Sequence, residues 1–110
     1  MITLCIRYTL AANKLADFEA YAKGLAKPVE RSGGTMAGYY LPTMMAGPTN
    51  IAIGLIDFPS LAAYEEYRAR LASDPDAAEN LRRAERAGCI LIEDRSILRR
   101  VVETAGVNAR

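Results

Sequence analysis

The chain has 110 residues, enough for one globular domain with its own core, and 51% of them are hydrophobic while 25% are charged. The net charge is +1 and the sequence has no block of basic residues, which argues against nucleic-acid binding. Histidine is absent, which excludes Ser-His-Asp and Cys-His catalytic groups and removes the commonest metal ligand.

An alternating pattern predicts the first strand over residues 2–10, with the even-numbered apolar residues sharing one face. A helix is expected next, with Asn13 capping its amino end. Pro28 cannot donate a helical hydrogen bond. We therefore expect a kink or a helix end near Lys27, followed by one more turn to Arg31.

Ser32-Gly33-Gly34 is expected to end this helix and open a turn. A second strand is then predicted over Thr35–Leu41, in which Gly38 indicates a bulge or a close approach by another backbone. Residues 42–49 contain two prolines and are predicted to form a loop.

Residues 51–56 are apolar at every position, which predicts a third strand buried on both faces. Ser60 is expected to cap the second helix. The stripe of this helix that is expected to face the core consists of Leu61, Tyr64, Arg68 and Leu71. Because one chain has only enough helix to cover one sheet face, the strand needs a second cover, and a second copy of the protein is the expected one.

Asp74-Pro75 predicts the start of a third helix, which Gly88 ends. Its narrow apolar stripe, expected to pack closely on the helix before it, consists of Ala77, Ala78, Leu81 and Ala84. The last strand is predicted over residues 89–102, with a bulge or an exit from the core at Glu93-Asp94. Residues 103–110 are expected to be a frayed tail after a single domain of residues 1–102.

The predicted order is strand, helix, strand, strand, helix, helix, strand. This βαββααβ order favours an α+β, ferredoxin-like sandwich in which helices cover one face of a four-stranded antiparallel sheet. The other face would be apolar and bare. Two such faces packed together would form a homodimer through the open sheet face, with a closed barrel and an interior cavity.

Several short motifs, in this order and spacing, resemble the NIPSNAP family over residues 2–100. They are Tyr8 in the first strand, Ser32-Gly33-Gly34, Gly38-Tyr39-Tyr40, the segments 47–50 and 60–64, Asp74-Pro75, and the segment 93–99. The resemblance implies the dimeric α/β-barrel superfamily, which also includes cofactor-free monooxygenases, haem-degrading enzymes and stress-response dimers. NIPSNAP members themselves have no settled biochemical activity.

The sequence departs from the usual family pattern at positions expected to face the barrel interior. Relatives commonly carry an acid and an arginine where Leu4 and Ile6 stand, and often a histidine and a tryptophan where Gly54 and Ile56 stand. The expected lining of the interior is Leu4, Ile6, Tyr8, Ala52, Gly54 and Ile56. This set is apolar and leaves room, and it assigns no catalytic residue.

One functional hypothesis is that the barrel holds a small apolar or aromatic molecule. Tyr8, Tyr40 and Asn50 would orient it by hydrogen bonds, Gly54 would leave space, and Arg95 at the mouth would meet an acidic group. A cofactor-free oxygenase needs only a base or a hydrogen-bond donor, and tyrosines are able to serve. The alternative is a non-enzymatic dimeric interaction module whose interior is filled by its own side chains.

The remaining expectations concern compartment and cofactors. Met1 leads directly into a strand pattern, so no signal peptide is expected, and no apolar run is long enough to span a membrane. A cytoplasmic protein is therefore predicted. Cys5 and Cys89 are expected to be buried free thiols, with a redox or metal role as a lesser hypothesis. No cofactor and no metal are expected.

Overall fold

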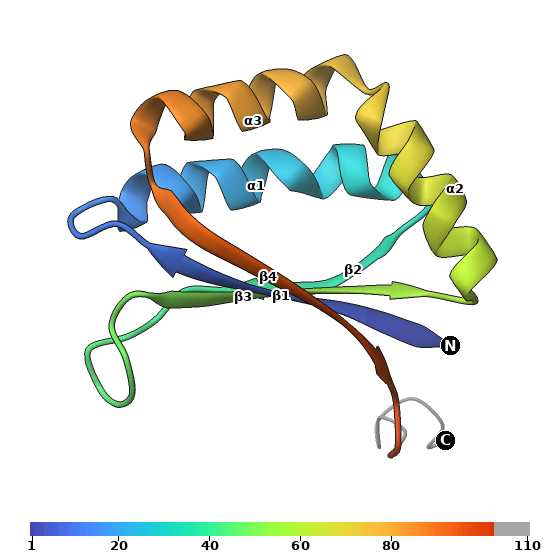
Figure 1. Cartoon of the computed structure of the whole chain (residues 1–110), viewed down its shortest axis with the longest axis horizontal. Coiled ribbons are helices and arrows are strands. Elements are labelled where there is room, and N and C mark those ends of the chain that lie inside the picture. Colours follow the sequence, from blue (N-terminus) through green and yellow to red (C-terminus); the bar gives the residue numbers. More distant parts are fainter. Residues whose placement is uncertain (103–110) are drawn as a thin grey trace.

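The computed structural model of the protein describes residues 1–102, which form four strands and three helices. Figure 1 shows them in two layers, a sheet and a set of helices lying over one of its faces. The elements in chain order are β1 (Ile2–Leu10), α1 (Leu15–Arg31), β2 (Thr35–Tyr40), β3 (Ile51–Phe58), α2 (Leu61–Ala72), α3 (Pro75–Ala87) and β4 (Ile90–Arg99). Within the described residues, no helix has the length and apolar character that a membrane crossing requires.

The sheet has the order β2-β3-β1-β4, and every neighbouring pair is antiparallel. The central strand β1 places Ile6 opposite Gly54 of β3 on one side and opposite Arg95 of β4 on the other. This arrangement confirms the predicted α+β fold with a four-stranded antiparallel sheet. The register also determines which side chains of β4 lie on the same face of the sheet as the buried side chains of β1.

The core lies between the sheet and the helices. Along β1 and β3 the buried side chains alternate with less buried ones, as expected for strands covered on one face. The ring of Tyr8 of β1 packs at a tilt against that of Phe18 of α1 with 4.7 Å between ring centroids, and Phe58 of β3 lies at the same distance from Tyr67 of α2. These aromatic contacts, with the buried Val29 of α1, join the sheet to the helix layer.

The orientation of the sheet corrects one expectation. Leu4, Ile6 and Tyr8, with their neighbours on β3, face the helices of the same chain and not the outside of the sheet. Gly54 lies under the ring of Tyr39, so closely that a side chain there would overlap the ring. The prediction that these residues face a barrel interior was therefore wrong, because they lie on the face that the helices of the same chain cover.

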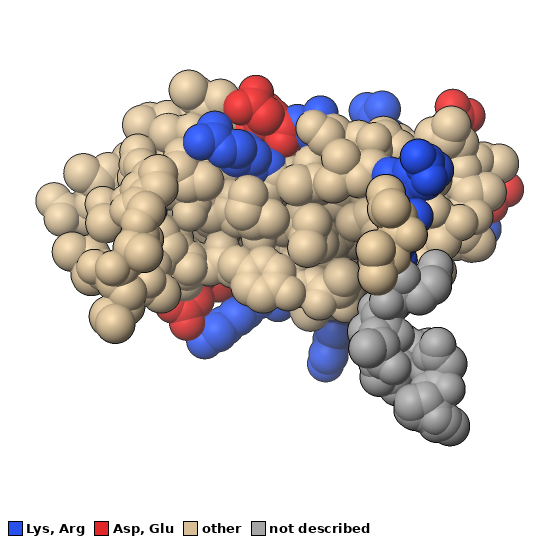
Figure 2. All heavy atoms as spheres, turned by 90° about the horizontal axis from the view of Figure 1, so that it is seen from below, with Lys and Arg blue, Asp and Glu red and all other residues tan. Residues whose placement is uncertain are grey.

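The opposite, open face of the sheet carries the other residues of each strand. On β3 these are Ile51, Ile53 and Leu55, which are partly buried in the single chain. On β4 they include Ile92 and Leu98, which are 53% and 45% exposed. Figure 2 views the molecule from this side and shows an extended surface without charged side chains at its centre, with the charges towards its margins.

Helix α1 differs from its prediction at the amino end. Asn13 takes a left-handed backbone conformation with φ of 63°, and Lys14 occupies the cap position without a side-chain hydrogen bond. At the other end the helix does not stop near Lys27 but runs through Pro28, and it ends at Arg31, as the predicted last turn does. Pro28 is buried, and because it lies close to the helix end it removes only one helical hydrogen bond.

The caps of α2 and α3 were predicted correctly. The Ser60 side chain accepts from the Ala63 backbone N–H, and Asp74 accepts from the backbone N–H groups of Asp76 and Ala77. Gly88 ends α3 in a left-handed conformation.

Their packing was predicted less well. In α2 the buried residue is Tyr67, while Leu61 is 57% exposed and Arg68 is also exposed. Helix α3 packs mainly against α1 and not against α2, as Figure 1 shows. Asn80 of α3 is buried there and donates a hydrogen bond of 2.8 Å to the carbonyl of Tyr21.

Both bulge predictions concern strand register. The pairing of β2 with β3 shifts between Met36 and Gly38, which confirms an irregularity at Gly38. On β4 the shift lies at Leu91, which is skipped between two paired neighbours, and the strand then runs unbroken through Glu93 and Asp94. The predicted interruption at Glu93-Asp94 was thus misplaced, and β4 ends at Arg99. The expected tail of residues 103–110 lies outside the described residues.

Candidate functional site

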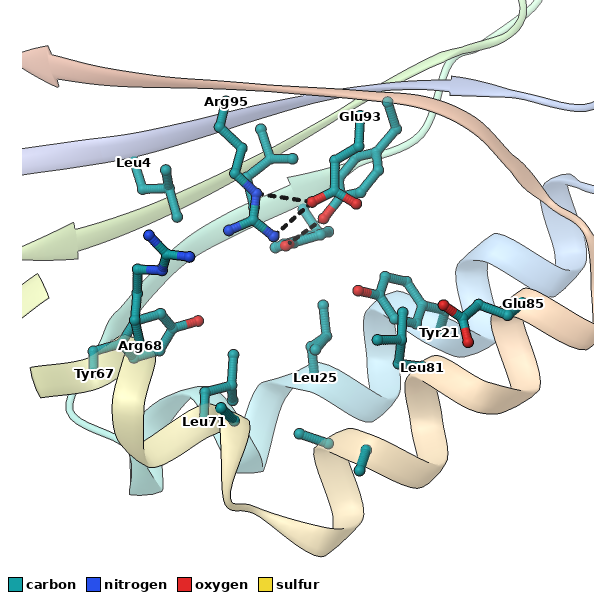
Figure 3. A pocket seen from close by; sticks show the side chains of 16 residues that line it. Leu4, Tyr21, Leu25, Tyr67, Arg68, Leu71, Leu81, Glu85, Glu93 and Arg95 are labelled. Carbon is teal, nitrogen blue, oxygen red and sulfur yellow. Dashed lines mark hydrogen bonds and ion pairs between the residues drawn. The ribbon is translucent and has the colours of Figure 1, made fainter. Parts of the chain in front are cut away.

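A cavity of about 490 Å³ lies between the sheet and the helix layer, and we call it the helix-side cavity. Figure 3 shows side chains from β1 and β4 on its sheet side and from all three helices on the other. Its volume falls within the range of small-molecule pockets. The apolar side chains of its lining include Leu4, Ile6, Leu25, Leu71 and Leu81.

Four tyrosines from four different elements contribute the polar groups of the inner part. The hydroxyl oxygens of Tyr8 and Tyr39 lie 2.9 Å apart and share a hydrogen bond, and Tyr21 and Tyr67 line the same cavity. Burial raises the pKa of Tyr8 and Tyr39 well above the ordinary value, and raises the pKa of Tyr21 and Tyr67 to about 12. All four phenols are therefore neutral near pH 7, and they act as hydrogen-bond donors and acceptors.

An ion pair on β4 borders the cavity. Because Leu91 forms a bulge, Glu93 and Arg95 lie opposite Tyr8 and Ile6 and project towards the helices. The Arg95 guanidinium donates two hydrogen bonds to one Glu93 oxygen, at 2.9 Å from Nε and 2.6 Å from Nη2. The side chains of Glu93 and Arg95 are 27% and 49% exposed, so the pair stands where the cavity meets solvent.

A second arginine reaches the cavity from α2. Arg68 belongs to the lining, and its guanidinium carbon lies 6.0 Å from the ring centroid of Tyr64, where a cation–π contact holds it. Figure 3 shows the guanidinium groups of Arg68 and Arg95 both directed into the same opening. The cavity thus combines an apolar, tyrosine-rich interior with a mouth that carries two arginines and one paired carboxylate.

The structure separates the five residues predicted to bind a ligand. Tyr8 and Arg95 both line the helix-side cavity. Gly54 lies beneath the Tyr39 ring and leaves the space that this ring occupies.

The other two lie elsewhere. Tyr40 is 53% exposed and, by its pairing with Ile53, belongs to the open face. Asn50 stands in the turn before β3, where its backbone carbonyl accepts from the Leu10 N–H at 2.8 Å. The cavity therefore does not bring these two residues together with Tyr8 and Arg95.

Sequence reasoning missed several residues of the cavity, and the sequence carries a signal for only some of them. Tyr39 comes next to Tyr40, and only the irregularity at Gly38 decides which of the two faces the helices. Tyr67 lies three residues, about one helical turn, after Tyr64, and this spacing is a sequence signal that the two tyrosines share one face of the helix. Glu93 has no such signal, because its orientation depends on the unpredicted bulge at Leu91.

The comparisons with known proteins identify the family. The NIPSNAP family model matches residues 3–103 of this chain. The chain belongs to the NIPSNAP family. A search of curated proteins gave no match.

Solved NIPSNAP structures share the fold of this NIPSNAP chain. A protein from Agrobacterium tumefaciens has a TM-score of 0.81 and 22% identity, covering 92% of this chain and 94% of its own. A NIPSNAP-like domain protein from Burkholderia xenovorans has a TM-score of 0.77 and 21% identity, with coverage of 94% and 87%.

A protein of stated activity is also similar in fold. SnoaB of Streptomyces nogalater, a cofactor-independent oxygenase, has a TM-score of 0.62 and 14% identity, and the match covers 96% of each chain. At this identity the likeness concerns the fold alone. The chemistry of this NIPSNAP protein has to be argued from its own side chains.

Proposed function

We propose that this NIPSNAP protein binds a small, flat, apolar or aromatic molecule in the helix-side cavity. The observation that carries the proposal is a cavity of about 490 Å³ that is lined by leucines and by four tyrosines. A ligand would gain affinity from the burial of apolar area, while a few fixed polar groups would select its orientation.

The tyrosine pair would orient the ligand. Tyr8 and Tyr39 together carry two hydroxyl protons, and the hydrogen bond between them uses one. The second proton is available to a carbonyl or hydroxyl oxygen of a bound molecule. Because Tyr8 is fully buried and packed against Phe18, the position of its hydroxyl, one of the two that share this bond, is fixed before a ligand arrives.

We place binding ahead of catalysis. A cofactor-independent oxygenase like SnoaB is the catalytic alternative, and it needs a group that takes a proton from the substrate. The raised pKa values of the cavity tyrosines, which follow from burial, oppose their use as bases near neutral pH. The carboxylate of Glu93 is already engaged by Arg95.

We also propose that the chain works as a homodimer through the open face. Ile51, Ile53 and Leu55 of β3 and Ile92 and Leu98 of β4 are apolar side chains that a single chain leaves partly or largely in contact with water. Between them on the same face, Arg7 of β1 lies opposite Asp94 of β4. Packing two such faces together would bury both. The helix-side cavity would then lie outside the dimer interface, one in each subunit.

The test of ligand binding uses a cavity-filling variant. Ala78 of α3 lines the cavity, and Ala78→Phe would occupy part of its volume. Ala69→Phe on the exposed side of α2 adds the same side chain outside the cavity and serves as the control. We expect small aromatic molecules to raise the melting temperature of the native protein and of Ala69→Phe, but not of Ala78→Phe.

Mass spectrometry of the purified protein under native conditions gives a second readout, since a retained molecule would appear as an added mass. Equal responses of all three proteins to the aromatic set, or no response in any of them, would contradict the proposal.

A further inference from the structure

We propose that the ligand of the helix-side cavity is an aromatic monocarboxylate, with its ring among the tyrosines and its carboxylate at the mouth between Arg68 and Arg95. The inference rests on the proposed function of the cavity and adds the chemical class of its occupant. It is carried by the distribution of charge around the opening.

The first part of this distribution is an arginine without a carboxylate partner. Within residues 1–102 the guanidinium of Arg68 takes part in no ion pair, and Tyr64 is the ring that it contacts. Arg70, two positions later on α2, instead pairs with Glu66, with 3.9 Å between its Nη2 and the Glu66 Oε1. It does not line the cavity. Arg68 is thus the helix cation that remains available to a ligand at the opening. Its planar group suits a carboxylate, to which it offers two parallel N–H donors.

The second part is the ion pair of β4. Glu93 neutralises one of the two arginines at the mouth, so that Arg68, Arg95 and Glu93 together carry one net positive charge. Glu85, the other carboxylate of the lining, lies beside Tyr21 and Leu81 at the opposite end of the cavity in Figure 3. One unmatched positive charge at the mouth favours a ligand with one negative charge. A cationic ligand would meet two arginines there.

The third part is the contrast between the mouth and the interior. The inner wall is made of leucines and neutral phenols, so a carboxylate placed there would lose its hydration without gaining a cation. The arginines are half-exposed or exposed, so an anion beside them keeps part of its hydration. A molecule with an apolar ring at one end and a carboxylate at the other satisfies both regions. The aromatic walls formed by Tyr8, Tyr39 and Tyr67 favour a flat ring over a flexible chain.

Three probes of one shape test the charge preference: naphthalene-2-carboxylate, its neutral carboxamide, and the cationic 2-(aminomethyl)naphthalene. Titration calorimetry at fixed ionic strength measures the affinity of the full chain for each. We expect the carboxylate to bind about tenfold more tightly than the carboxamide, the scale of one charge-assisted hydrogen bond. The cation is expected to bind most weakly, and raised salt should reduce the affinity of the carboxylate alone.

Two substitutions at the mouth should move this affinity in opposite directions. Arg68→Gln should weaken binding of the carboxylate about tenfold and leave the carboxamide unchanged. Glu93→Gln removes the competing anion from Arg95, so it should tighten binding of the carboxylate. Arg70→Gln, which removes the same charge from the same helix outside the cavity, should change neither.

The outcomes separate this inference from the proposed function. Equal affinities for the carboxylate and the carboxamide, or the same affinity in Arg68→Gln and Glu93→Gln as in the native protein, would overturn the monocarboxylate while leaving an aromatic ligand in place. Failure of all three probes to bind would overturn both. A fall in affinity in Arg70→Gln equal to that in Arg68→Gln would show a general effect of net charge and would also overturn the inference.

Discussion

Gly24 offers a test of how α1 and α3 pack. The effect of Gly24→Ala on the free energy of unfolding should be destabilising or stabilising depending on the residue that lies opposite on α3. A β-carbon at Gly24 would overlap the Asn80 side chain, approaching its Oδ1 most closely and its Cγ at 2.7 Å. Asn80 is only 3% exposed, and it holds its hydrogen bond to the Tyr21 carbonyl at 2.8 Å. The amide therefore cannot move aside without breaking that bond.

The expected magnitude follows from three contributions. Overpacking at a buried contact costs about 1–3 kcal/mol, and a buried hydrogen bond that is broken costs about 1–3 kcal/mol more. Alanine has a higher helix propensity than glycine, which stabilises the helix by about 1 kcal/mol. We therefore expect Gly24→Ala to lower the free energy of unfolding by roughly 1–5 kcal/mol.

In an Asn80→Ala background, Gly24→Ala should instead raise the free energy of unfolding. With the amide gone, the overlap is relieved and the helix propensity remains, so Gly24→Ala should stabilise that background by about 0.5–1 kcal/mol. Urea unfolding followed by far-UV circular dichroism, at one fixed protein concentration, measures all four proteins of the cycle. A Gly24→Ala protein as stable as the native one, or equal effects in both backgrounds, would refute this account of the α1–α3 contact.

Three further predictions concern the open face, a helix cap and the buried phenols. Leu55→Asp would place a carboxylate on the open face, so light scattering should show monomers while the helix content is unchanged. Leu61→Asp, at an exposed position of α2, should leave the protein dimeric. A dimeric Leu55→Asp protein would contradict the proposed interface. Asp74→Ala removes the cap of α3 and should lower the urea midpoint, whereas Asp74→Asn should lower it much less, since asparagine caps equally well. Asp74 also forms an ion pair with Arg31 of α1, with Nη2 and Oδ2 2.9 Å apart, and equal losses in the two variants would assign the effect to this pair. Burial raises the pKa of Tyr21 and Tyr67 from 10.0 to about 12, so the unfolded chain releases these protons first and stability should fall as the pH rises from 10.0 towards about 12. Stability that does not change with pH across that window would contradict the burial of Tyr21 and Tyr67. So would a pH profile of stability in Tyr21→Phe that is the same as in the native protein.

The fold could be predicted from the sequence because each element carries a strong local signal. Alternation marks β1, a continuous apolar run marks β3, and Ser60 and Asp74 mark the starts of two helices. The order of these elements then restricts the topology to few possibilities, one of which is a sheet covered by helices on one face. The same signals say little about side-chain contacts between elements.

The site was harder to predict because two bulges decide which residues face it. The irregularity at Gly38 turns Tyr39 and not Tyr40 towards the helices, and the bulge at Leu91 does the same for Glu93. A shift of one residue moves every later side chain to the other face of a strand. The choice of face for Gly54 was wrong for a different reason, since both faces of β3 are apolar and alternation alone cannot rank them.

A crystal structure of the protein grown with naphthalene-2-carboxylate would test the central claim most directly. The account predicts the ring beneath the sheet, beside the hydroxyls of Tyr8 and Tyr39, with the carboxylate within hydrogen-bond distance of the Arg68 guanidinium. It would be contradicted by a ligand bound between the open faces of two sheets, or by a helix-side cavity closed by its own side chains.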